Sequence, residues 1–289
     1  MLLLSYDHQL IIASQGDHTG IPMSWEVPID DSMHILYNRP MQVLWNLIKY
    51  ITIGKGIFSV PFLQSAIFVR TSLLNDKLEP VIGDKCQLDV RLTENIPDVE
   101  IMPSHHRANP AASDPVLDKI GVFTFMPTLI QPKSRGSVRL RSSKPTEPPV
   151  VELGFLTHPD DIITFRKAVR LTFKLADQMT KEGYLLKPIA SQLPASESDD
   201  DIDEYIKKTI RSCLHYMSSC RMAPEDDPLH PGVVDDELRV YGVDGLRIAD
   251  TSIFPDSVAT PTMAPAVVVA EKCAQMIQRE AAATAATAH

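Results

Sequence analysis

A histidine and an aspartate near the carboxyl end of the 289-residue chain are the side chains best suited to chemistry. His215 lies in the stretch Leu214–Met222, and Asp250 follows Leu246–Ile248, which the sequence predicts as a short buried strand. An imidazole titrates near neutral pH, so it can accept a proton from a substrate. A carboxylate at the carboxyl end of a strand lies where α/β sheets bind ligands. We therefore expect proton transfer and ligand binding in this region.

An apolar helix is expected to begin at Pro265, shortly after Asp250. Proline is favoured in the first turn of a helix, and the apolar run Ala264–Ala270 continues from it. The free N–H groups and the positive dipole end at the start of a helix stabilise negative charge. This arrangement suits an anionic or electron-rich ligand.

A metal site is not expected from the histidines and cysteines. Cys213, His215 and Cys220 supply ligand types that zinc accepts, but no fourth ligand has a suitable spacing. His105 and His106 are predicted to lie in a solvated loop.

The low glycine content excludes several common nucleotide and hydrolase sites. The chain has 12 Gly and 23 Pro, and no G-x-G-x-x-G turn occurs in it; Gly54-Lys55-Gly56 lacks the third glycine. A phosphate loop, an H-E-x-x-H zinc helix and a G-x-S-x-G elbow are also absent from the sequence. The net charge of −9 argues against a nucleic-acid partner, because phosphate binding needs clustered cations.

No targeting or membrane segment is predicted. Met1–Ser14 has no lysine or arginine ahead of its apolar residues, and polar residues interrupt it early. Val43–Val60 contains lysine and asparagine and falls short of a membrane span. The 4 Cys form no disulfide framework, which favours a reducing compartment. We expect a cytoplasmic protein whose oligomeric state the sequence leaves open.

Several helices and strands must position these residues. Apolar residues at helical spacing predict a helix over Met41–Ile51 that ends at Gly54. Alternation predicts a strand over Ser137–Arg141, and Val150–Phe155 is predicted to pair with it in antiparallel orientation.

Two further helices are expected between these strands and His215. The first starts within Thr157–Asp161, where a proline and two carboxylates favour a helix start. The second follows the Ser- and Asp-rich loop Ser196–Asp201 and buries a stripe from Ile202 to Cys213. Ala281–His289 is expected to be a frayed tail.

Four ordered motifs near the carboxyl end resemble those of the glucose-methanol-choline (GMC) oxidoreductases. They are H-x-x-x-S-C-R-M from His215, G-V-V-D-x-x-L-R-V-x-G-V from Gly232, G-L-R-I-A-D-x-S-I-x-P from Gly245 and A-P-x-x-x-x-A-E-K from Ala264. Upstream, Ser134–Val138 resembles the S-R-G-x-V strand of the family, and His158–Asp161 resembles its H-P-x-D helix start. Gln15–His18 resembles its Q-D-H step with one residue inserted.

The resemblance covers nearly all of this chain but only the carboxy-terminal half to two thirds of the family. It implies an α+β fold: an antiparallel-sheet substrate domain covered by helices, plus the carboxy-terminal part of an FAD-binding α/β domain whose amino-terminal Rossmann half is absent. The resemblance implies three consecutive parts. Residues 1–131 are the amino-terminal part of the substrate domain, with lid-like loops. Residues 132–277 are the GMC carboxy-terminal domain, with the substrate sheet to about 210 and the FAD-domain return segment after it, and residues 278–289 are a disordered tail.

The resemblance also implies a reaction and its residues. Family members are FAD-dependent and oxidise CH–OH donors, here a small-molecule alcohol, by hydride transfer to flavin N5. His215 falls on the catalytic base of the family. Asp250 and Thr251 match positions that meet the FAD ribityl and pyrophosphate region, and Thr262 and Met263 match the turn that faces the flavin pyrimidine edge.

One departure from the family predicts impaired catalysis. Its second catalytic position, a His or Asn, falls on Pro261, whose side chain neither donates nor accepts a hydrogen bond. Together with the missing glycine-rich loop, this keeps a second interpretation open: a non-catalytic remnant or interaction protein that retains the GMC fold. A third interpretation is that the chain is half of a longer protein.

Overall fold

The computed structural model describes residues 12–59, 65–75, 77–81, 95–107, 117–228 and 230–287. The segment Met1–Ser14, in which no targeting signal is predicted, lies largely outside these residues, and Cys86, one of the four cysteines, lies outside them too. The chain forms two compact units that interleave along the sequence. Unit 1 comprises Met1–His18, Ile130–Asp161 and Ser212–His289, and unit 2 comprises Thr19–Leu129 and Ile162–Arg211.

Unit 2 is built on an antiparallel sheet. Its central strand β6 (Gly121–Leu129) pairs on one side with β5 (Val99–Ser104) and on the other with β3 (Met23–Val27). Seven strands belong to this sheet, the others being β2 (Thr19–Gly20), β4 (Ile67–Val69), β9 (Lys187–Pro188) and β10 (Arg211–Ser212), the last at the boundary of the unit. Alternate side chains point to opposite faces, so Phe123 and Phe125 share one face with Trp25.

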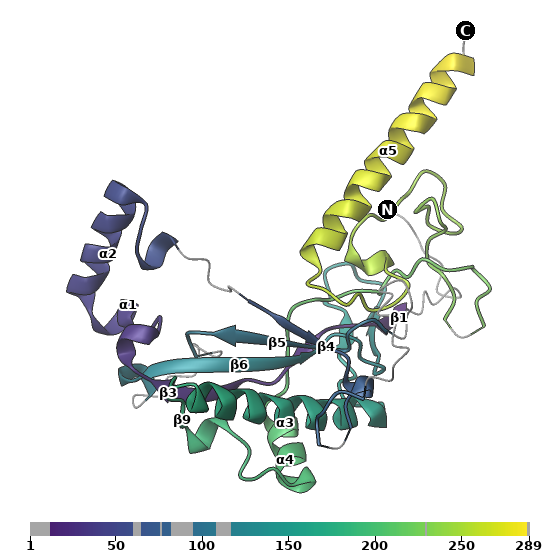
Figure 1. Cartoon of the computed structure of the whole chain (residues 1–289). Coiled ribbons are helices and arrows are strands. Elements are labelled where there is room, and N and C mark those ends of the chain that lie inside the picture. Colours follow the sequence, from purple (N-terminus) through teal and green to yellow (C-terminus); the bar gives the residue numbers. More distant parts are fainter. Residues whose placement is uncertain are drawn as a thin grey trace. The chain divides into compact units, whose positions relative to one another are not determined.

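Helix α3 (Pro159–Lys181) lies along one face of this sheet (Figure 1). Trp25 on β3 meets Phe173 on α3 with ring centroids 6.2 Å apart, which identifies the covered face. Helix α4 (Asp199–Thr209) packs on α3, where Arg166 forms an ion pair with Asp203 at 2.6 Å. Both helices were predicted. Ser198 caps α4 by accepting a hydrogen bond from Asp201 N, as its place before three aspartates favours.

Short elements complete unit 2. Helix α2 (Pro40–Ile53) confirms the predicted helix, and Gly54 ends it with φ of 65°, a left-handed conformation that favours glycine. Its apolar side chains are largely exposed; Trp45, for example, is 56 % exposed. The remaining elements are α1 (Ile35–Asn38) and the 3-10 turns η1 (Ile29–Asp31), η2 (Ile57–Ser59), η3 (Thr71–Leu73), η5 (Leu117–Lys119) and η6 (Ala190–Gln192).

Unit 1 contains a three-stranded antiparallel sheet, long loops and a terminal helix. The sheet has the order β1 (Ile12–Gln15), β7 (Gly136–Arg139) and β8 (Val150–Glu152), which confirms the predicted antiparallel pair. The 3-10 turn η7 (Thr251–Ile253) and helix α5 (Met263–Thr287) follow in the carboxy-terminal part. A buried cluster holds the loops together: Met217, Val233, Val234, Leu238, Ile253, Phe254 and Cys273.

The structure corrects four expectations. Leu246–Ile248 forms no strand; Arg247 makes a single bridge with Arg239, and Leu246 is 43 % exposed. The tail predicted to be disordered is helical through Thr287, because its alanines favour helix. His105 and His106 are half-buried rather than solvated, and burial lowers the pKa of His106 to about 4. The helix predicted to bury a stripe from Ile202 to Cys213 ends earlier, at Thr209, and Arg211–Ser212 form the short strand β10 instead.

A buried carboxyl in the sheet gives a stability prediction. Glu100 on β5 is 2 % exposed, and its Oε2 has no hydrogen-bond partner in the described structure. Burial raises its pKa, so the charge it acquires as the pH rises above its ordinary value of 4.5 destabilises the folded state. We expect Glu100→Met to raise the free energy of unfolding by about 1–2 kcal/mol at pH 8 and by less at pH 4, measured by urea unfolding. An equal effect at both pH values would contradict this.

Candidate functional site

The site in unit 1 is assembled from two segments that lie far apart in the sequence. Gly16 N donates to Met217 O at 2.9 Å, and Met217 N donates to Gly16 O at 3.0 Å. A Cβ at Gly16 would lie 3.3 Å from Met217 Cγ, so the close approach favours glycine. His18 O accepts from Cys213 N at 2.9 Å, which extends the contact by one more pair. Residues 16–18 therefore hold the loop that carries His215 in place through backbone hydrogen bonds.

This contact places two histidine rings against each other. His18 Nδ1 lies 2.9 Å from His215 Nδ1, and the rings meet edge to face with centroids 5.0 Å apart. His18 is 0 % exposed, whereas His215 is half-buried. The second nitrogen of His18, Nε2, lies 2.9 Å from Val258 O. Val258 precedes the turn into α5, so the histidine pair is tied to that turn as well.

The hydrogen bonds determine which nitrogen of each neutral ring carries the proton. A carbonyl oxygen only accepts, so His18 Nε2 must be protonated and donate to Val258 O. His18 Nδ1 is then an acceptor, and His215 Nδ1 must donate to it. It follows that His215 Nε2 carries a lone pair. No hydrogen bond joins this Nε2 to another residue in the described part of the chain, so it is open to a ligand.

Burial keeps both rings neutral. It lowers the pKa of His18 to about 4, with a smaller contribution from the charge of His215. Burial also lowers the pKa of His215. At neutral pH the pair is therefore uncharged, and His215 Nε2 is a free base. Such a group can take a proton from a hydroxyl placed within hydrogen-bond distance.

The backbone around His215 is strained and is held by specific bonds. Leu214 has φ of 61° and Ser218 has φ of 68°, conformations that cost non-glycine residues about 1–2 kcal/mol each. Leu214 N donates to Ser212 Oγ at 2.8 Å, and His215 N donates to Asp17 Oδ1 at 3.0 Å. Asp17 is buried, and burial raises its pKa. Strain of this kind concentrates at functional sites, where the surrounding structure fixes it.

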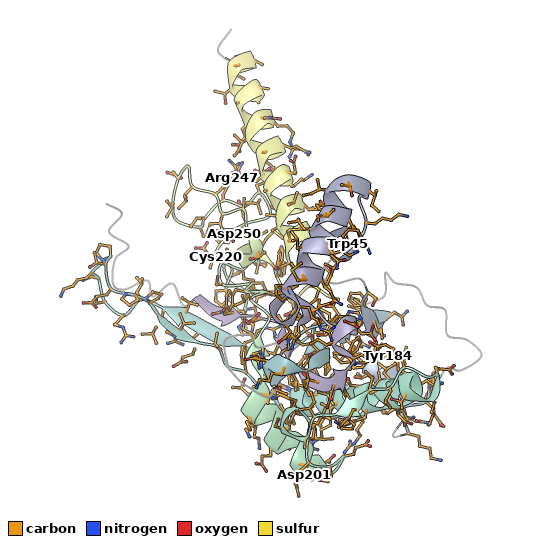
Figure 2. All side chains as sticks on the ribbon, turned by 90° about the vertical axis from the view of Figure 1, so that its left-hand side faces the viewer. Trp45, Tyr184, Asp201, Cys220, Arg247 and Asp250 are labelled. Atoms are coloured by element: carbon orange, nitrogen blue, oxygen red, sulfur yellow. The ribbon has the colours of Figure 1, made fainter. Side chains whose placement is uncertain are left out.

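The structure connects Thr251 and Asp250 to the same loop. Thr251 Oγ1 donates to Tyr216 O at 2.8 Å, and Ser218 N donates to Thr251 O at 3.1 Å. Asp250 is exposed and caps η7 by accepting from Ser252 N at 2.8 Å. Figure 2 shows Asp250 close to Cys220, whose N donates to Ser252 O at 2.8 Å. Asp250 is therefore positioned by its role as the cap of η7 and not, as expected, by the end of a strand.

The structure does not join Thr262 and Met263 to the His215 loop. Met263 begins α5 and is 80 % exposed, and Thr262 O accepts from Ala266 N at 3.0 Å. In the described residues, neither side chain is hydrogen-bonded to the loop. Pro261 is exposed beside them, so its ring supplies no polar group there. Helix α5 begins two residues before Pro265, the start expected from the sequence.

Sequence reasoning found His215 but not its partner. The motif at Gln15–His18 was the available signal, since it placed a buried histidine and aspartate in one short stretch. Its pairing with residues 213–217 depends on a contact across about 200 positions, for which a single sequence gives no pattern.

The low pKa of His18 predicts how stability depends on pH. The folded-state value of about 4 lies below the ordinary 6.5, so the unfolded chain binds the proton first as the pH falls. The stabilisation is complete above pH 6.5 and is lost towards pH 4, by roughly 3 kcal/mol. We expect urea unfolding between pH 7 and 4 to show this loss, and His18→Leu to remove it. If the difference in unfolding free energy between the original chain and His18→Leu did not change with pH, the lowered pKa of His18 would be contradicted.

Comparison with known proteins identifies relatives for half of the chain. Residues 132–270 match the family described as GMC oxidoreductase. An oxygen-dependent choline dehydrogenase of Brucella anthropi is 42 % identical over 145 residues, which are 50 % of this chain and 26 % of that protein. The same enzyme of Rhizobium rhizogenes is 39 % identical over 145 residues, with the same coverage. The chain thus matches about a quarter of the length of these relatives.

Solved structures share the fold over nearly the whole chain. A formate oxidase matches with a TM-score of 0.72 and 22 % identity, over 95 % of this chain and 48 % of that one. A fungal aryl-alcohol oxidase matches with a TM-score of 0.68 and 23 % identity, over 94 % of this chain and 48 % of that one. The expected fold class is therefore confirmed. No helix in the described ranges is long and apolar enough to cross a membrane.

Proposed function

We propose that this chain, whose residues 132–270 match the GMC oxidoreductase family, is a carboxy-terminal portion of such an enzyme and serves FAD-dependent oxidation of CH–OH donors. The observation that carries the proposal is the His18–His215 pair, which leaves His215 Nε2 unprotonated and open. A neutral base at this position is what alcohol oxidation requires, because the hydroxyl proton must leave for hydride to be released. A small-molecule alcohol is the proposed substrate.

The residues at the start of α5 fit the flavin end of FAD. The first amide N–H groups of a 25-residue helix have no partner within the helix, and its dipole favours negative charge there. Met263, Val267 and Val268 are exposed apolar side chains on the same turns, which suit a flat ring. Thr262 and Met263 would face that ring, and Asp250 and Thr251 would meet the ribityl and pyrophosphate region. The sequence has no G-x-G-x-x-G turn, so these contacts concern the flavin side of the cofactor.

In the proposed reaction the residues of this chain bind and deprotonate the alcohol. FAD, when bound, supplies the acceptor for the hydride. His215 Nε2 accepts the hydroxyl proton, and the charge that forms on the imidazole is shared with His18 through the Nδ1 contact. Pro261 gives no second hydrogen bond to the substrate oxygen, so the rate is expected to be lower than in an enzyme with a donor there.

The test is a flavin titration of the purified chain followed by anaerobic addition of an alcohol. Binding of FAD should perturb its visible spectrum, and a donor should bleach it. Choline and an aryl alcohol are suitable donors, because a relative and a structural neighbour carry their names. A protein that leaves the spectrum of FAD unchanged at all concentrations would contradict the proposal.

A second candidate function is a non-catalytic protein that retains the fold. Pro261 and the absence of a glycine-rich turn from the sequence favour it. This alternative predicts a folded chain that does not bind flavin, or one that binds flavin without reduction by any donor. The same titration therefore separates the two.

A further inference from the structure

A cavity in unit 2 has the size of a small-molecule site. It measures about 620 Å³, within the usual range of roughly 300–1,000 Å³ for ligand pockets. Its lining includes Phe123 and Phe125 of β6 and Leu175 and Met179 of α3. None of its lining residues belongs to the His18–His215 site, which lies in unit 1. The cavity is therefore a separate candidate for ligand binding.

Four rings form a continuous aromatic wall in this cavity. The ring of Phe123 contacts those of His105 and Phe125, each with centroids 5.0 Å apart, and that of Tyr184 at 6.1 Å. Phe123 is 3 % exposed and Phe125 is 2 % exposed, so these two rings are held in the core. Tyr184, labelled in Figure 2, follows α3 and adds a hydroxyl. Aromatic faces attract apolar groups and cations.

The charge of the lining is negative. Asp31 at the end of η1 is exposed, and among the described residues that line the cavity there is no lysine or arginine. Asp31 also forms no ion pair in the part of the chain that the structure describes. Its charge lies close enough to Tyr184 to add to the effect of burial, and both raise the pKa of that phenol. The cavity thus presents an uncompensated carboxylate beside a protonated hydroxyl.

We propose that this cavity binds a small amine with an aromatic or branched apolar body. The ammonium group would pair with the exposed Asp31 and be attracted by the ring of Tyr184, while the apolar body would lie against Leu175 and Met179. A carboxylate ligand would be repelled by Asp31. A neutral isostere would lack the ion pair and the cation–π attraction.

The test uses the full chain with methionine labelled by ¹³C at the methyl group. Benzylamine at pH 7 is the probe, and the Met179 methyl signal, identified with Met179→Leu, reports on the cavity. We expect a saturable shift with a Kd on the order of 1 mM. The signal of Met217, which is buried in unit 1, should not move. This readout needs neither flavin nor activity, so it is independent of the proposed oxidation.

Variants test whether an ion pair with Asp31 contributes to binding, apart from changes in net charge or folding. Asp31→Asn is expected to weaken benzylamine binding about threefold to fivefold, since the carboxylate is exposed. Asp30→Asn changes the neighbouring exposed acid, which does not line the cavity, and should leave the Kd unchanged. Leu175→Trp fills the cavity and should abolish the shift, with the other methionine signals showing that the fold is kept.

Three results would each overturn the proposal. The first is the absence of a saturable Met179 shift with benzylamine. The second is binding of neutral benzamide as tight as that of benzylamine. The third is equal weakening by Asp30→Asn and Asp31→Asn, which would show that only net charge matters.

Discussion

Replacing His215 by Gln is expected to slow the reduction of FAD by an alcohol by about 10²–10⁴-fold. The amide keeps hydrogen-bonding groups in the site but cannot take up a proton at neutral pH. His215 Nε2 is the only atom of the histidine pair left as a free acceptor, because the other three nitrogens are used in the contacts between the rings and to Val258. Stopped-flow mixing of the FAD complex with the donor under anaerobic conditions measures the rate.

The matched control for this variant is His158→Gln. His158 directly precedes α3, its side chain is 43 % exposed, and its Nδ1 accepts a hydrogen bond from Asp160 N, so its ring makes its contact at the helix start and not with the histidine pair. We expect it to leave the rate within about twofold of the original. If His215→Gln reduced FAD as fast as His158→Gln does, His215 would not be the base.

The largest expected effect on stability comes from His18→Leu. His18 is 0 % exposed and links His215 Nδ1 to Val258 O. Leucine fills similar space but leaves the Val258 carbonyl and the Nδ1–H of His215 without partners, which costs about 3 kcal/mol of unfolding free energy. Urea unfolding at pH 7 measures the loss. The variant should also allow His215 to adopt either neutral tautomer, because no group then accepts a hydrogen bond from its Nδ1.

His18→Asn tests whether a hydrogen-bond acceptor at position 18 is what holds His215 in its Nδ1-protonated form. The asparagine side chain keeps an acceptor close to where Nδ1 of the histidine lies. It should hold His215 in its Nδ1-protonated form while recovering only part of the lost stability. If both variants lost the same free energy and neither changed the tautomer, His18 would be a packing residue alone.

Much of the fold follows from local sequence signals. Asp160 and Asp161 after Pro159 mark the start of α3, and Gly54 marks the end of α2, because these residues act on their own helix ends. Alternation around Val138 was enough to predict β7 and its partner β8. These signals need no knowledge of distant parts of the chain.

The site itself depends on contacts that local signals do not encode. His18 and His215 are joined by the bridge between Gly16 and Met217, and nothing in either segment specifies the other. Leu246–Ile248 has the composition of a strand but lies in a loop whose residues pack on the cluster around Val234 and Leu238. Composition likewise gave no indication of the cavity in unit 2, because its lining comes from separate strands, a turn and a helix.

The central claim is that His215 is a neutral base with its lone pair on Nε2. Long-range ¹H–¹⁵N correlation of the histidine rings at pH 7 tests it directly, because the shifts of the two nitrogens distinguish the tautomers and the cation. The account predicts that His215 is protonated at Nδ1 and that His18 is protonated at Nε2, with both rings neutral. A His215 ring protonated at Nε2, or charged at pH 7, would contradict it.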